Sequence, residues 1–214
     1  MLSFDQTNAF YRQFMHDKYS QNGEDGVLEK LLEQLNIHHG LCCEFGAVDG
    51  VHLSNTFKLV ENGWKAVYIE CNPVHFDDLK NLEKSYPILS LTKKVEIRGE
   101  NSLDNLLAQT FLCEDFDILV IDVDGPDNLI WRSLINYKPK IVMIEIAAKY
   151  TTEDVEQIEL PSYRHDSPYF DLVTGTSLVA MSKIAQDKGY TPIMNTFGNL
   201  IAVRNDYVHL LKIK

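Results

Sequence analysis

The sequence predicts an α/β protein built on a doubly wound, mostly parallel sheet that ends in an antiparallel hairpin. Two observations predict this fold. Short runs rich in Ile and Val alternate with segments of helical periodicity, and buried strands separated by helices are typical of right-handed βαβ units. The last two runs, 191–196 and 199–206, flank a tight turn at Gly198, and strands joined by so short a turn pair antiparallel.

Each predicted element follows from its own pattern. The first core helix carries an apolar stripe over 27–35 and is expected to open at Asn22 and close at Gly40. The helix after the Asn72 cap is expected to turn four residues inward, namely Phe76, Leu79, Leu82 and Tyr86. The other expected strands cover 41–47, 64–70, 88–95, 116–125 and 140–148, and the other helices cover 53–62, 102–111, the segment around 130–135, and 176–190.

The composition is that of one globular domain. The chain has 214 residues, of which 45% are hydrophobic and 24% charged, and a chain of this length can bury one good core. We expect a single domain over 1–214, with an aromatic N-terminal arm at 1–19 that packs on the sheet edge or serves as a lid or dimer contact. An irregular stretch at 149–175 is long for a connection in a compact domain and is expected to contact substrate.

The charge balance limits the partners. The chain carries 20 basic and 31 acidic side chains, a formal net charge of −11, whereas binding to nucleic acid or to an anionic membrane needs clustered Lys and Arg. No apolar run approaches the ~20 residues of a membrane span, and the N-terminal residues lack the pattern of a signal peptide. We therefore expect a cytoplasmic protein that acts on a small molecule, with no nucleic-acid or membrane partner. The sequence does not define an oligomeric state.

The cysteines form no metal or redox motif. The four are Cys42, Cys43, Cys71 and Cys113, and none has the CxxC or Cys/His spacing that zinc requires. Cys42 and Cys43 are adjacent in an expected strand and therefore point to opposite faces. We expect buried free thiols in a reducing compartment.

The first strand ends in a glycine turn with two carboxylates. Segment 44–50 reads EFGAVDG, in which Gly46 and Gly50 permit a tight turn and a close ligand because they lack a Cβ. Glu44 and Asp49 flank this turn. The segment matches neither GxGxxG nor a P-loop, so NAD is the least favoured cofactor. An acidic turn suits a cation better than a pyrophosphate, and the alternative is an ordinary β–α turn.

The second strand ends in another acid. Glu70 follows Glu44 by 26 residues, and a carboxylate at this place in a doubly wound sheet can accept two hydrogen bonds from a ribose diol. Asn72 is close enough to help, although capping of the following helix explains it equally well. Together with the glycine turn, Glu70 favours a nucleoside ligand.

Three more acids lie at the ends of the fourth and fifth expected strands. Asp122 and Asp124 share one face of an extended chain, with Val123 on the other, and Glu145 ends the neighbouring strand. Such acids repel one another unless a cation or protons intervene, so they can hold a divalent metal, act as a general base or face a cationic cofactor. Contact with cofactor or substrate is favoured over a metal site, and Asp127 is expected to cap the next helix.

Six segments together carry a resemblance to a known family. They are YSQNGEDGVL (19–28), EFGAVDGVHLSNT (44–56), GWKAVYIECNP (63–73), LDNLL (103–107), IDVDGPDNLIWRSL (121–134) and GTSLVAMSKIAQDKGY…GNLIAVRND (175–206). In order and spacing they resemble the FkbM-type methyltransferase family, especially a branch with an N-terminal SQxGED helix. The resemblance implies a class I methyltransferase, with a Rossmann-like sheet of order 3-2-1-4-5-7-6, that uses S-adenosyl-L-methionine and usually O-methylates sugars or small molecules.

The resemblance also implies roles for single residues. The methionine part of the cofactor would be bound by the turn, through Glu44, Gly46, Ala47, Asp49 and Gly50. The ribose would be held by Glu70 with Asn72, the adenine end would lie near Asp104, the sulfonium and the nucleophile near Asp122, and Gln21 would reach over the cofactor. Asp104 is explained equally well as an acid at a helix N-terminus, and Asn22 and Asp25 as helix caps. The chain departs from the family pattern ExGxGxG at Val48-Asp49, and IDVDG stands where many members have a DVEG-like run.

A hydroxyl nucleophile benefits from a general base. His165, in the 149–175 stretch, is the candidate because imidazole titrates near neutrality, and Arg164 beside it can hold an anionic group of the substrate. We therefore expect a methyltransferase that O-methylates a sugar or other small hydroxylated acceptor. Two alternatives stay open: a non-catalytic binding module of the same fold, and a metal-dependent enzyme that uses Asp122, Asp124 and Glu145.

Overall fold

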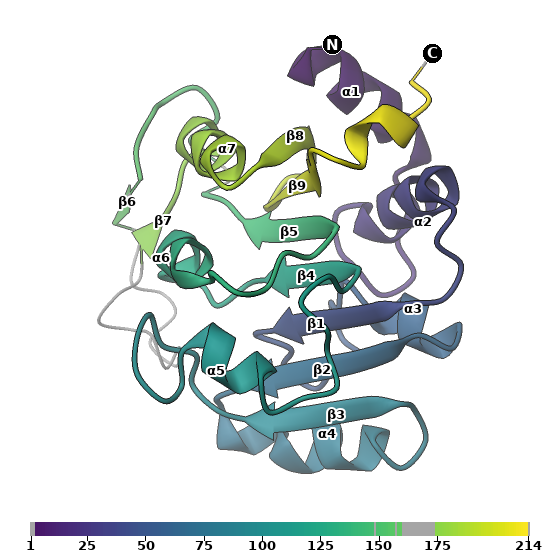
Figure 1. The fold of residues 1–214 in the computed structure, drawn as a ribbon, viewed down its shortest axis with the longest axis vertical. Coiled ribbons are helices and arrows are strands. Elements are labelled where there is room, and N and C mark those ends of the chain that lie inside the picture. The colour runs from purple at the N-terminus through teal and green to yellow at the C-terminus, as the bar shows by residue number, and fades with distance from the viewer. Residues whose placement is uncertain (1–2, 148, 157, 160–173, 214) are drawn as a thin grey trace.

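The chain forms a seven-stranded sheet with helices on both faces (Figure 1). The computed structural model describes residues 3–147, 149–156, 158–159 and 174–213. The strand order is β3-β2-β1-β4-β5-β9-β8, and all neighbours are parallel except β5–β9 and β8–β9. Numbered within this sheet alone, the order is 3-2-1-4-5-7-6, so the predicted sheet with its antiparallel C-terminal hairpin is confirmed. The strands are β1 (Leu41–Phe45), β2 (Lys65–Glu70), β3 (Ile88–Thr92), β4 (Ile118–Ile121), β5 (Ile141–Glu145), β8 (Tyr190–Asn195) and β9 (Asn199–Arg204), and a separate small pair is formed by β6 (Ile158–Glu159) and β7 (Thr174–Gly175).

The helices build one core layer on each face of the sheet. Apolar residues of α2, α3 and α4 pack on one face, and those of α5, α6 and α7 pack on the other. The alternation along β1 shows the division, because buried Cys42 faces the first layer and buried Cys43 the second. The helices are α1 (Phe4–Tyr11), α2 (Glu24–Leu35), α3 (Phe57–Glu61), α4 (Phe76–Leu82), α5 (Leu103–Leu107), α6 (Asp127–Ser133) and α7 (Leu178–Asp187), with short 3₁₀ turns at η1 (Arg12–Phe14), η2 (Pro73–His75) and η4 (Val208–Leu210).

Three local expectations are corrected. Helix α2 ends at Leu35 and not at Gly40, because its C-cap Asn36 has a φ of 56° and adopts the left-handed conformation that stops a helix. Phe76 is 39% exposed, because α4 begins at this residue and only Leu79 is fully buried on that short helix. Cys71 is half-buried and Cys113 is exposed, so the prediction of buried thiols holds only for the two cysteines of β1.

The described part of the N-terminal arm covers the edge of the sheet at β8. Helix α1 begins with a capping box between Ser3 and Gln6. It lies against β8, where Asn8 Nδ2 donates to Asn195 Oδ1 at 3.0 Å. An exposed edge strand is a template for unwanted pairing, and this packing covers it. Of the helices in the described residues, none is long and apolar enough to cross a bilayer.

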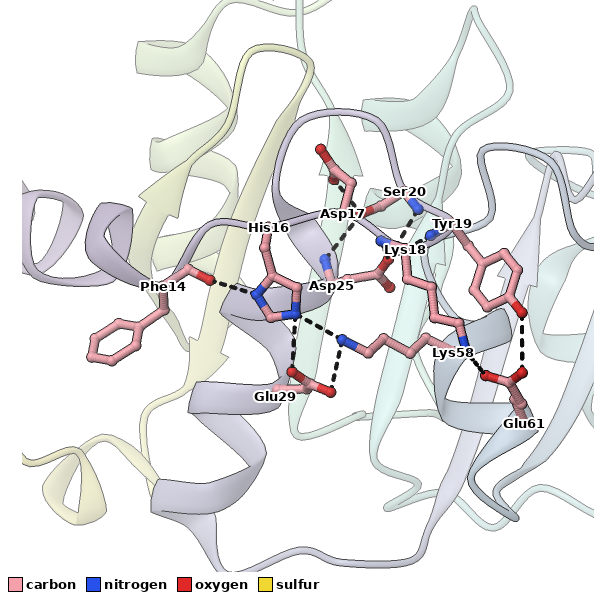
Figure 2. A network of polar contacts seen from close by, with 10 residues as sticks. All are labelled: Phe14, His16, Asp17, Lys18, Tyr19, Ser20, Asp25, Glu29, Lys58 and Glu61. Carbon is pink, nitrogen blue, oxygen red and sulfur yellow. Dashed lines mark hydrogen bonds and ion pairs between the residues drawn. The ribbon is translucent and has the colours of Figure 1, made fainter.

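A polar network holds the segment that joins this arm to α2 (Figure 2). Asp25 Oδ2 accepts backbone hydrogen bonds from Lys18, Tyr19 and Ser20 at 2.7, 2.8 and 3.1 Å. The carboxylate therefore holds the preceding loop, where the sequence suggested a cap for its own helix. Lys58 adds a bond between α3 and α2, since its Nζ lies 2.8 Å from Glu29 Oε1. This network places residues 21–23 beside the carboxyl edge of the sheet.

Candidate active site

A cavity of about 330 Å³ lies at the carboxyl ends of β1, β2, β4 and β5 and beside the start of β9. In the strand order, β1 lies between β2 and β4, so the chain winds away from β1 in both directions. Such a topological switch point is where open α/β sheets bind their ligands. The volume falls within the range of small-molecule sites.

The cavity gathers most of the residues predicted from the sequence. Nine of them line it: Gln21, Glu44, Gly46, Ala47, Glu70, Asn72, Asp122, Asp124 and Glu145. They come from segments far apart in the chain, and the parallel strands bring them to one edge. His165 and Arg164 lie outside the described residues.

Three predicted site residues lie outside this lining. Asp49 Oδ1 accepts hydrogen bonds from the backbone of Val51 and His52 at 2.9 and 2.7 Å, which closes the turn. A Cβ at Gly50 would stand 2.8 Å from Leu82, so this glycine serves packing of the loop on the core. Asp104 receives two backbone hydrogen bonds, both 2.9 Å long, from residues 135 and 136 after α6. The structure gives each of these residues a local structural role.

Glu44 is a buried carboxylate at the end of β1. It accepts hydrogen bonds from Ser54 Oγ at 2.7 Å, the backbone N–H of Asn55 at 2.8 Å and Thr56 Oγ1 at 2.5 Å. Burial raises the pKa of Glu44, and these hydrogen bonds partly oppose the shift. The bonds hold residues 54–56 in a loop, which explains why α3 begins at Phe57 and not at 53 as predicted.

Glu70 organises the other side of the cavity. Its Oε2 accepts a hydrogen bond from the backbone of Val48 at 2.9 Å, and Oε1 accepts from Cys71 and Asn72 at 2.7 Å each. A carboxylate offers about four lone-pair sites, so these bonds leave about one for a ligand. Asn72 Oδ1 accepts from the backbone of Val74 at 3.1 Å, which confirms its predicted capping of the next helix.

The ends of β1 and β4 approach each other closely at Gly46. Its φ is +77°, and a Cβ there would stand 1.6 Å from the carbonyl oxygen of Asp122. Only glycine allows both the left-handed backbone and this contact. Gly46 therefore lets the glycine turn pack directly against the backbone of Asp122. A single ligand at the switch point can then contact both segments.

Asp122, Asp124 and Glu145 form an acidic cluster, in which one carboxylate oxygen from each lies within 4.8 Å of the others. The sequence predicted this approach from strand alternation, and that reason is wrong, because β4 ends at Ile121 and Asp124 has a φ of 57°. A turn, and not the pleat, brings the two aspartates together. The separation suits one cation or one cationic group between the three residues.

Burial shapes the protonation of the acids around this cluster. The pKa of Glu145 is raised by burial and by the nearby charges of Asp122 and Asp127. Burial also raises the pKa of Asp127 to about 6, against hydrogen bonds that it accepts from the backbone of Val123 at 2.9 Å and Gly125 at 3.1 Å. Asp127 is the first residue of α6 and holds the preceding turn, where the sequence predicted a helix cap.

Backbone strain gathers at the same cavity. In the described residues, four non-glycine positions have positive φ, and three of them line the cavity: Val48 at 52°, Leu53 at 61° and Asp124 at 57°. Val48 and Leu53 also stay 40% and 43% exposed. For a β-branched residue such a φ is costly, and strained residues of this kind concentrate at functional sites.

Sequence reasoning missed five polar residues in the lining: His52, Ser54, Asn55, His75 and Asn199. Asn55 and Asn199 are 4% and 2% exposed, and the Oδ1 atom of each is buried without a hydrogen-bond partner. Both lie in segments that carry the family resemblance, but nothing in those segments assigned them a site role, so only the three-dimensional arrangement identifies them. Five carboxylates and no Lys or Arg line the cavity in the described part of the chain, so it suits a cationic ligand or one rich in hydrogen-bond donors.

Comparison with known proteins identifies the fold. No family model matches the chain, and no curated protein matches its sequence. A Staphylococcus aureus protein assigned as a caffeoyl-CoA O-methyltransferase has 12% identity and a TM-score of 0.54, over 95% of this chain and 93% of that one. A Klebsiella pneumoniae protein assigned as an O-methyltransferase has 12% identity and a TM-score of 0.52, over 94% and 89%. The CurJ carbon methyltransferase has 13% identity and a TM-score of 0.50, over 84% and 52%. The chain thus has the class I methyltransferase fold, while the FkbM branch stays a prediction.

Proposed function

We propose that the protein is an S-adenosyl-L-methionine-dependent methyltransferase that O-methylates a sugar or another small hydroxylated acceptor. One observation carries the proposal. Acids that end three neighbouring strands, Glu70 of β2, Glu44 of β1 and Asp122 after β4, line one cavity across the switch point of a class I methyltransferase fold. We infer that these acids face, in this order, a ribose hydroxyl, an ammonium and a sulfonium of the cofactor.

The cavity offers partners for the ribose and for the methionine ammonium of the cofactor. Glu70 retains about one acceptor site for a ribose hydroxyl. Gly46 and Ala47 border the cavity. Because Gly46 has no side chain, a methionine chain can approach the backbone there. The unpartnered Asn55 Oδ1 beside Glu44 suits the ammonium of that chain. The ribose hydroxyl and the ammonium are hydrogen-bond donors, so these contacts need no Lys or Arg, and the described lining holds none.

The bound cofactor would supply a methyl group on a positively charged sulfur. Transfer to oxygen is an in-line displacement, in which alignment of the two reactants supplies much of the acceleration. Asp122 and Glu145 lie where a positive charge and an incoming hydroxyl would meet. Burial and its acidic neighbours raise the pKa of Glu145, which makes its ionised carboxylate a stronger base, and we assign it to accept the hydroxyl proton. His165 remains the second candidate base.

The preference for oxygen rests on the resemblance and on the names of two neighbours, which assign them as O-methyltransferases. A carbon methyltransferase shares the fold as well, and fold alone does not select the acceptor atom. The hydrogen-bond acceptors of the lining support a hydroxylated molecule. A sugar is the simplest acceptor with several such donors.

Calorimetric titration with S-adenosylhomocysteine tests the proposal. We expect micromolar binding to the unaltered protein and an increase in Kd of about 10- to 100-fold in Glu70→Gln, the effect of a lost hydrogen bond to a charged group. Glu83→Gln is the matched control, because Glu83 also accepts backbone and hydroxyl hydrogen bonds but lies outside the cavity. No binding to the unaltered protein would contradict the proposal. Equal losses in both variants would contradict the role of Glu70.

A further inference from the structure

Asn199 is a buried polar side chain that the proposed cofactor site does not use. Its exposure is 2%, and its Oδ1 has no hydrogen-bond partner. A buried acceptor without a partner costs about 1 to 3 kcal/mol, and native structures retain few of them. Because Asn199 lines the cavity, a ligand there can supply the missing donor.

The orientation of the Asn199 amide is set by Glu24. Asn199 Nδ2 donates to Glu24 Oε1 at 3.1 Å, and Thr196 Oγ1 donates to the same oxygen at 2.6 Å. Glu24 Oε2 accepts from the backbone of Asn22 at 2.8 Å, and the whole side chain is buried. An ionised carboxylate only accepts hydrogen bonds, so the NH₂ group of Asn199 must face Glu24. The carbonyl oxygen is thereby directed away from Glu24.

The position of Asn199 separates it from the ribose end of the cavity. Asn199 begins β9 and lies directly opposite Glu145 of β5 in the antiparallel register, so the two side chains share a face. Between β2, which ends at Glu70, and β9 lie β1, β4 and β5, and four strand spacings amount to about 19 Å. A sulfonium is joined to its ribose by one methylene group, so it lies well short of β9. Asn199 therefore stands on the side from which an acceptor would approach.

The charge at this end restricts the acceptor. Gln21, Glu145 and Asn199 line it, and the described lining holds no Lys or Arg. Within the described lining, an anionic group would meet carboxylates and an amide oxygen and no Lys or Arg to pair with. A hydroxyl or an ammonium would instead satisfy Asn199 Oδ1.

We propose that Asn199 determines acceptor specificity by accepting a hydrogen bond from a hydroxyl or ammonium group of the methyl acceptor, and that Glu24 is the positioning residue that orients its amide. The inference rests on the proposed function, whose cofactor end lies at β1 and β2. It assigns a substrate class, a neutral or cationic molecule rich in donors, and rejects phosphorylated or carboxylated acceptors. It also assigns a role to Glu24, the buried acid of the SQNGED segment.

The first test measures the side-chain amide signals of Asn199 by NMR in protein loaded with S-adenosylhomocysteine. Three probes are compared: methyl β-D-glucopyranoside, glucosamine and glucose 6-phosphate, which are neutral, cationic and anionic. We expect the neutral and cationic probes to shift the Asn199 signals and to bind about tenfold more weakly to Asn199→Leu, the size of one lost hydrogen bond. S-adenosylhomocysteine should bind the variant within about twofold of its original Kd. Asn195→Leu on β8 is the matched control, because Asn195 lies outside this cavity.

The second test addresses orientation and does not depend on the stability of Asn199→Leu. Glu24→Gln introduces an NH₂ group that can meet the Asn199 carbonyl, so the Asn199 amide can turn and present its own NH₂ to the cavity. We expect binding to shift at least threefold toward glucose 6-phosphate relative to the neutral probe, about 0.7 kcal/mol. Asp25→Asn neutralises a neighbouring buried carboxylate in the same helical turn without contact to Asn199, and it should leave this ratio unchanged.

The outcomes separate the inference from the proposed function. If S-adenosylhomocysteine does not bind the unaltered protein, the proposed function fails first. If it binds, three results overturn the inference alone: preference of the unaltered protein for glucose 6-phosphate, no response of Asn199 to any probe, or an equal shift in probe ratio in Glu24→Gln and Asp25→Asn. Loss of S-adenosylhomocysteine affinity in Asn199→Leu with unchanged probe binding would move Asn199 to the cofactor.

Discussion

The two edges of the sheet differ in what surrounds their buried acids. At the amino edge, Asp117 precedes β4, and its Oδ1 lies 2.6 Å from Lys140 Nζ while its Oδ2 accepts from the backbone of Leu41 at 2.8 Å. At the carboxyl edge, the acids of the cavity have no Lys or Arg beside them in the described lining. The first edge neutralises its charge and stabilises the fold. The second gathers several acids next to strained backbone, an arrangement that suits a cationic ligand.

The difference shows how to tell a structural carboxylate from a functional one. Asp117 contacts a cation and a backbone donor that belong to the fold itself. Glu145 has a raised pKa because burial and neighbouring acids disfavour its charge. Neutralising Asp117 should therefore lower stability and leave ligand binding unchanged, whereas neutralising Glu145 should raise stability and weaken binding.

Of the variants that compare the two edges, Asp117→Asn should change the free energy of unfolding the most. The substitution leaves Lys140, whose side chain is 20% exposed, without its ion partner. Breaking such a pair on one side should lower the free energy of unfolding by about 3 kcal/mol. Urea denaturation followed by circular dichroism measures it. Affinity for S-adenosylhomocysteine should stay unchanged.

The matched control for that change is Asp115→Asn. Asp115 pairs with Arg204 but its side chain is 55% exposed, and exposed ion pairs contribute only about 0 to 1 kcal/mol. If Asp115→Asn lowered the free energy of unfolding as much as Asp117→Asn, burial would not explain the strength of the Asp117–Lys140 pair.

Glu145→Gln should have a smaller effect of the opposite sign. The amide oxygen can still accept the hydrogen bond from the backbone of Asp124, which is 3.1 Å long, while one of three clustered charges disappears. We expect unfolding to require about 1 kcal/mol more at pH 7, and ligand binding to weaken. If Glu145→Gln were destabilised and still bound ligand normally, Glu145 would be a structural acid like Asp117.

The gain from Glu145→Gln should depend on pH in a defined direction. A carboxyl whose pKa is raised by folding favours the folded state in its protonated form. That contribution is complete below the unfolded pKa, about 4.3 for Glu, and is lost as pH rises through the folded pKa. The unaltered protein loses stability over this window and the variant does not. The difference between them should therefore vanish near pH 4 and grow toward neutrality, as thermal melts at several pH values would show.

Val48→Gly should have the smallest effect. Val48 has a φ of 52°, so glycine relieves strain but adds freedom to the unfolded chain, and the two effects nearly cancel to within about 0.5 kcal/mol. Val51→Gly is the control, because Val51 lies in the same loop and is not among the positive-φ residues; it should lose about 1 kcal/mol. Equal losses measured by thermal melts would show that Val48 carries no strain.

Much of the fold could be predicted because its signals are local. Buried runs such as 118–121 of β4 and the hairpin around Gly198 are recognisable from a few neighbouring residues. The ends of elements were less accurate. Helix α3 starts at Phe57 because Glu44, ten and more residues away, binds the loop before it.

The site could be predicted only where strand ends mark it. Glu44, Glu70 and Asp122 follow buried strands, so the rule for parallel sheets brings them together. Asp49, after β1, and Asp104, in the first turn of α5, instead bind backbone groups outside the cavity. The side-chain direction after a strand depends on the turn that follows, which local patterns do not define.

The sequence by itself determined the order of strands and helices and the acidic character of the carboxyl edge. Periodicity and residue type are properties of neighbours in the chain. Only the tertiary structure decided which acids are neutralised, that Lys140 reaches Asp117, and that Glu24 orients Asn199 from 175 residues away. Hydrogen bonds and ion pairs act over a few ångströms in space, and the chain must fold before such distant residues meet.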